Sequence, residues 1–248
     1  METKIDFSVP QGWHELSDTQ LRYVYRLIAE DFGLDEVKLL CLLRWSGAKV
    51  VGRQSDGSYL LRLGKVLLEA TPVQLAELLP HLDWLCDFSP VPVRLAKIGR
   101  RRAVAADFQG VAFETYIVAE NLYQGYLATH QDALLDDVAT ALYPGFKSKL
   151  RTEERIAIFY WLASLKDFLA RRFPDYFAPA AASDGNLLGS PPASQLQEVM
   201  DAQLRALTKG DPVREAEVLA LDTWRALTEL NAQAKEYKLI NERHGRKP

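Results

Sequence analysis

The 248-residue chain carries 30 basic and 33 acidic side chains, a formal net charge of −3, and 48% of its residues are hydrophobic. This balance excludes an overall field that would gather nucleic acid or anionic lipid, so any such binding must be local. Two cysteines are too few for a disulfide framework. Because no apolar run is long enough for a membrane span and no signal-peptide pattern occurs, we expect a cytoplasmic protein.

The first third of the chain changes from helical to extended patterns. A Ser-x-x-Gln capping box at Ser17 opens a helix expected over residues 18–32, and a more apolar helix is expected over residues 35–45. An Asp-Gly turn joins two β-type runs, which predicts a hairpin, and a third run can extend it; these runs are residues 49–54, 58–63 and 65–69. Thr71 then caps a helix reaching about residue 85, which Pro80 must end, bend or split.

The middle of the chain is predicted to hold the core. A second hairpin is expected about Gly99, and a helix over residues 111–128 is apolar nearly all round, as a central helix should be. Further helices are expected over residues 133–143 and 152–173. Together these elements predict a mainly α-helical (α+β) body over residues 5–177 with one or two small β-hairpins.

The last third predicts a separate helical extension. A linker rich in Ala, Pro, Gly and Ser is expected at residues 178–193, followed by an extension over residues 194–243 that ends in one long amphipathic helix starting at Pro212. The apolar stripe of this helix must be covered, either by the body or by another protein. Its predicted partner-binding residues are Val213, Ala220, Trp224, Leu227, Leu230 and Tyr237.

No catalytic or metal-binding motif occurs, so a non-enzymatic protein without cofactor or metal is expected. The most unusual polar residues are Glu120 and Gln124, which share one face of the central helix. Glu120 is either a general acid or base, or a structural carboxylate that pairs with an arginine. The structural interpretation is favoured, because structural networks hold buried carboxylates as readily as active sites do.

A basic segment is the alternative functional feature. It is the densest positive cluster in the chain and could bind phosphates from a hairpin tip; its residues are Arg94, Lys97, Arg100, Arg101 and Arg102. No aromatic residues are interleaved with these cations, so a solvated loop or an acidic protein partner is favoured. A nucleic-acid-binding accessory protein is therefore the alternative function.

Several short sequence segments, spread over the chain, resemble those of a known family. They lie at residues 13–16, 20–24, 120–127, 159–166, 208–211 and 224–230. The chain resembles uncharacterised, mainly helical proteins encoded in prophage-like regions of Bacteroidetes-type bacteria, and its outline is similar to phage tail assembly chaperones, which coat the tape-measure protein. The resemblance implies an assembly or scaffolding factor of a phage-derived particle. Its C-terminal helix would bind a protein partner or self-associate.

Overall fold

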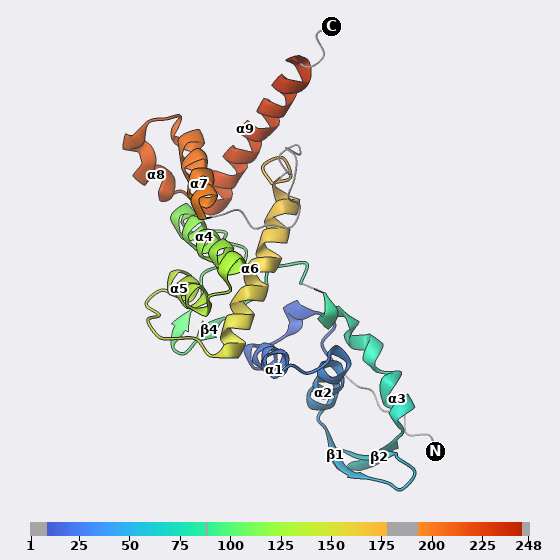
Figure 1. Cartoon of the computed structure of the whole chain (residues 1–248). Coiled ribbons are helices and arrows are strands. Elements are labelled where there is room, and N and C mark those ends of the chain that lie inside the picture. The colour runs from blue at the N-terminus through green and yellow to red at the C-terminus, as the bar shows by residue number, and fades with distance from the viewer. Residues whose placement is uncertain (1–8, 88, 178–192, 245–248) are drawn as a thin grey trace. The chain divides into compact units, whose positions relative to one another are not determined.

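The computed structural model describes residues 9–87, 89–177 and 193–244, and it is mainly helical with two small antiparallel sheets (Figure 1). The predicted fold class is therefore confirmed. The chain divides into two compact units. Unit 1 comprises Met1–Ser89 and Thr152–Ala157, and unit 2 comprises Pro90–Arg151 and Ile158–Pro248.

The helices of unit 1 follow the local sequence signals. They are η1 (Trp13–Glu15), α1 (Asp18–Ala29), α2 (Leu34–Ser46), α3 (Pro72–Ala76) and η2 (Leu79–Cys86). The capping box of α1 forms as predicted, with the Ser17 hydroxyl accepting from the Gln20 amide and the Gln20 side chain accepting from the Ser17 amide. The helix expected up to residue 85 is split before Pro80, which cannot donate a backbone hydrogen bond.

A three-stranded antiparallel sheet completes the regular structure of unit 1. Its strands are β1 (Ala48–Arg53), β2 (Tyr59–Leu63) and β3 (Val66–Ala70), in the order β1-β2-β3. The hairpin and its third strand thus form as predicted. The buried Glu154 carboxylate, in the part of the chain that returns to unit 1, accepts a hydrogen bond from the Arg22 guanidinium of α1 at 2.6 Å.

Unit 2 is built around α4. Its elements before residue 177 are β4 (Lys97–Ile98), β5 (Arg101–Arg102), α4 (Phe113–Thr129), α5 (Asp132–Leu142) and α6 (Thr152–Arg172), whose first residues belong to unit 1. The indole of Trp161 is fully buried and donates to the Ala106 carbonyl at 2.8 Å. The buried Tyr143 hydroxyl donates to the Leu95 carbonyl at 2.8 Å. These bonds attach the irregular segment before α4 to the helices.

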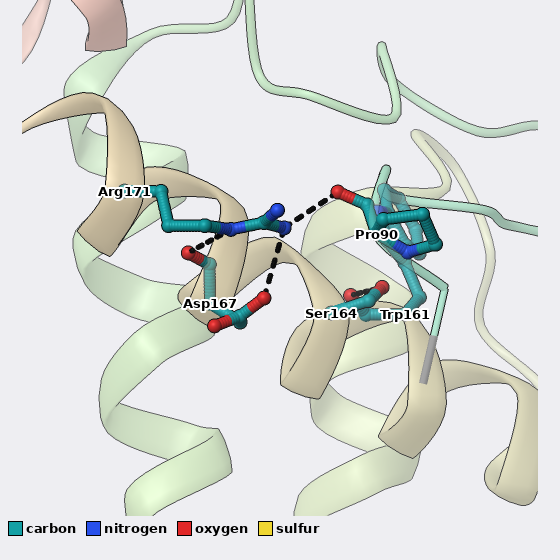
Figure 2. A network of polar contacts seen from close by, with 5 residues as sticks. All are labelled: Pro90, Trp161, Ser164, Asp167 and Arg171. Atoms are coloured by element: carbon teal, nitrogen blue, oxygen red, sulfur yellow. Dashed lines mark hydrogen bonds and ion pairs between the residues drawn. The ribbon is translucent and has the colours of Figure 1, made fainter. Parts of the chain in front are cut away.

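The C-terminal part of α6 is fixed to the start of unit 2 by Arg171 (Figure 2). Its guanidinium donates to the Pro90 carbonyl at 2.6 Å and pairs with the Asp167 carboxylate at 2.9 Å. About one turn before Asp167, the Ser164 hydroxyl donates to the Trp161 carbonyl at 2.9 Å. This buried hydroxyl is therefore satisfied within the helix. The surface of α6 that faces the core can therefore remain apolar.

The C-terminal segment forms several helices, namely α7 (Ala193–Thr208), η3 (Pro212–Arg214), α8 (Glu215–Leu219) and α9 (Thr223–His244). The single long helix predicted from Pro212 onward is therefore interrupted before Thr223. Asp222 explains the break, because its carboxylate accepts from the Arg225 amide at 3.1 Å and caps α9. The same carboxylate accepts from the Gly110 amide at 2.6 Å.

Backbone hydrogen bonds join the start of α9 to the start of α4. The Phe113 amide donates to the Leu221 carbonyl, and the Thr223 amide donates to the Val111 carbonyl, both at 2.8 Å. The predicted linker falls almost entirely on residues 178–192, which lie outside the described residues. The helices predicted to form a separate extension belong to the same compact unit as α4 and α5.

Candidate functional site

The first half of α9 is packed on its own unit through Trp224. The Trp224 indole donates to the Asp107 carbonyl at 2.8 Å, and its ring lies 6.2 Å from that of Phe168 and 5.9 Å from that of Phe173, between ring centroids. Leu227 is 0% exposed and Leu230 is 5% exposed. The chain itself therefore covers the part of the predicted stripe that runs from Trp224 to Leu230.

The second half of α9 is uncovered. Tyr237 is 69% exposed and Ile240 is 51% exposed, although both continue the apolar periodicity of the buried half. In Figure 1 this half of α9 projects beyond α4 and α7. Of the remaining predicted partner-binding residues, Val213 is 85% exposed on η3 and Ala220 is exposed between α8 and α9. The apolar periodicity of the sequence therefore does not distinguish the buried part of the stripe, at Leu227 and Leu230, from the exposed part, at Tyr237 and Ile240.

A groove of about 750 Å³ lies where α9 changes from buried to exposed. We call it the α4–α9 groove. Its walls come from α4, α6, α7, α9 and the segment after α6, and the residues that define it best are Tyr116, Glu120, Tyr176, Leu230, Ala234 and Tyr237. Leu230 and Tyr237, two of the predicted partner-binding residues, therefore line a concave groove.

Asn231 of α9 holds one wall of this groove in place. Its side-chain oxygen accepts from the Asp175 amide at 2.9 Å and from the Tyr176 amide at 3.0 Å. The segment that carries Tyr176 is thereby attached to α9 by two hydrogen bonds to backbone amides, which would otherwise need another acceptor.

Glu120 is held in a polar network at the groove. Its carboxylate accepts from the Lys166 ammonium at 3.0 Å and from the Gln124 amide at 2.8 Å. The structural interpretation of Glu120 correctly expected a cationic partner, but that partner is a lysine of α6 and not an arginine. Carboxylate and ammonium compensate each other, so the groove has no excess charge from this pair.

Two tyrosines contribute neutral phenols to the groove. Burial, followed by the negative charge of Glu120, raises the pKa of Tyr116 and the pKa of Tyr176 above the usual value for a phenol. Both hydroxyls are protonated at neutral pH, as an ordinary phenol is, and the raised pKa keeps them protonated at more alkaline pH as well. The groove combines neutral donors with apolar walls, which suits a polypeptide segment better than a charged substrate.

The polar network predicts a difference between two Glu120 variants. Glu120→Gln keeps an oxygen that can accept from Lys166, whereas Glu120→Leu leaves Lys166 and Gln124 without this acceptor. Because the pair is partly exposed, we expect Glu120→Leu to be less stable than Glu120→Gln by only about 1 kcal/mol. Urea midpoints of both variants measure the difference, and equal midpoints would show that the network contributes nothing to folding.

The structure places the predicted phosphate-binding residues on and beside the β4–β5 hairpin. Arg94 is used internally, because its Nε donates to the Val104 carbonyl at 2.6 Å. Lys97 of β4 lies opposite Arg102 of β5 in the antiparallel register. Arg100, Arg101 and Arg102 are exposed. The Arg101 guanidinium lies close to Gly145, so a side chain at position 145 would collide with this guanidinium. Phosphate binding by this surface remains a prediction.

No family model, curated protein or solved structure matches the chain. In the part of the chain that the structure describes, no group of three or more His, Cys, Asp or Glu side chains is placed to hold a metal ion. Within the same residues, each helix is too short or too polar to traverse a lipid bilayer.

Sequence reasoning missed Asp222 and Asn231, which position α9 and the groove. Asp222-Thr223 is a dipeptide typical of a helix N-terminus, and its occurrence inside an apparently continuous helix was a usable signal. Asn231 gave no comparable signal, because an asparagine in an amphipathic helix is usually solvated.

Proposed function

We propose that the chain is a non-enzymatic, cytoplasmic assembly factor that binds a protein partner through the second half of α9 and the α4–α9 groove. The observation that carries this proposal is the change from buried to exposed along the α9 stripe, from Leu230 through the half-buried Ala234 to Tyr237, at a groove that offers apolar walls. An exposed apolar surface beside a concave one is a typical binding surface for an amphipathic helix.

The specific form of the proposal is a tail assembly chaperone or structural component of a phage-derived particle. The resemblance of the chain and its helical C-terminal segment support this form, with the tape-measure protein as the partner. A helix of that partner would place apolar side chains in the groove and continue along Tyr237 and Ile240. Tyr237 is expected to be the central contact, because it lines the groove and is also the first exposed residue of the apolar stripe after Leu230.

The test uses the purified full chain and the tape-measure protein encoded in the same phage-derived region. We expect the two to form a complex in size-exclusion chromatography, and Tyr237→Asp to weaken binding about tenfold or more, since central aromatic residues dominate interface energies. Lys235→Asp on the same helix is the matched control, because Lys235 is exposed but lies outside the groove lining. Absence of a complex, or equal binding by both variants, would contradict the proposal.

A further inference from the structure

The β3 strand of unit 1 is an open, regular sheet edge. Its five residues pair with β2 without a register shift, and none outside the sheet, among the residues described, forms a backbone hydrogen bond with Val66–Ala70. Val66 is 45% exposed and Leu67 is 54% exposed. The strand contains no proline and no register shift, and Glu69 is its one charged residue, so it has few of the usual protections of an edge strand.

The opposite edge of the same sheet is protected. The pairing of β1 with β2 shifts register between Val50 and Gly52, which is the mark of a β-bulge. β1 also carries the exposed charges of Lys49 and Arg53. A bulge and edge charges both disfavour pairing with another strand. The sheet therefore has one edge suited to extension.

The turn before β3 determines which backbone groups point outward. Gly64 and Lys65 form a two-residue connection in which Gly64 has a φ of 59°, so Leu63 and Val66 are the hydrogen-bonded pair that closes the hairpin. Because the direction of backbone groups alternates along a strand, Val66, Leu68 and Ala70 bond to β2. The amides and carbonyls of Leu67 and Glu69 point away from the sheet.

We propose that β3 pairs antiparallel with β3 of a second copy of this chain, about a two-fold axis at Leu68. Leu67 then lies opposite Glu69 of the second copy, and the two residues exchange hydrogen bonds on each side of the axis. Because only one edge of each sheet is open, the contact closes as a dimer and does not continue into a fibre.

The side chains of the sheet match this pairing. Val50, Leu61 and Leu68 are aligned across the three strands, so they form an apolar row that ends at the β3 edge. Pairing about Leu68 continues this row directly into the same row of the second copy. The Glu69 carboxylate, the one charge of the strand, lies 2.7 Å from the Ser58 hydroxyl, which lies at the same distance from the Asp56 carboxylate.

Two substitutions at Leu67 test this register. Leu67→Glu places a carboxylate opposite Glu69 of the second copy on both sides of the axis, whereas Leu67→Lys places an ammonium there. Sedimentation velocity of the full chain should show a wild-type dimer, a dimer about tenfold weaker for Leu67→Glu, and one at least as strong as wild type for Leu67→Lys. Within its own sheet Leu67 faces Arg62, so the glutamate variant keeps a favourable cross-strand neighbour and should fold.

The control is Val51→Glu, which adds the same charge to an exposed position of the bulged β1 edge. We expect it to leave the dimer unchanged. A wild-type chain that stays monomeric up to about 100 µM, or Glu and Lys variants of Leu67 that associate equally, would overturn the proposal. All Leu67 variants should still bind the α9 partner. A failure of dimerisation through β3 can therefore be distinguished from a failure of the proposed partner binding.

Discussion

We expect Trp224→Ala to lower the free energy of unfolding by about 3 kcal/mol, the lower end of the range for aromatic truncation, because the indole is half-buried. The substitution removes a ring that contacts both Phe168 and Phe173, and it leaves the Asp107 carbonyl without its indole donor. The cavity would lie between α6 and α9, where the buried half of α9 is attached to unit 2.

The measurement is urea unfolding monitored by circular dichroism. Tyr237→Ala is the matched control on the same helix, and since Tyr237 is largely exposed, its effect should be about 0.5 kcal/mol or less. Trp224→Phe should fall between wild type and Trp224→Ala, because it keeps ring packing but loses the hydrogen bond. Equal destabilisation by Trp224→Ala and Tyr237→Ala would mean that α9 is not anchored through Trp224.

Elements with local signals could be predicted from the sequence. The capping box at Ser17, the Asp-Gly turn between β1 and β2, and Pro80 each act through residues a few positions away. Their chemistry is complete within a short stretch of chain, so the sequence alone is sufficient to read it.

The interruption before α9 depends on partners that are distant in sequence. Asp222 bonds to the Gly110 amide 112 positions away, and this tertiary bond favours the cap over helix continuation. The network at the groove has the same origin, because Lys166 reaches Glu120 across 46 positions. Periodicity correctly identified the apolar face of α9, but only the packed structure shows that its cover ends near Leu230.

The central claim is that α9 consists of a half that completes the core of unit 2 and a half that is free for a partner. Two truncated chains separate these halves. A chain ending at Ala234 loses only the uncovered part of α9, whereas a chain ending at Phe177 also loses the buried Val218, Leu227 and Leu230.

Thermal unfolding of both truncated chains, compared with the full chain, tests this claim most directly. Removal of several buried side chains should cost more than any single substitution, and since each contributes about 2–5 kcal/mol, the chain ending at Phe177 should lose its cooperative transition in unit 2. The chain ending at Ala234 should unfold cooperatively at a temperature within a few degrees of the full chain. A chain ending at Phe177 that unfolds as cooperatively and at the same temperature as the full chain would contradict the account.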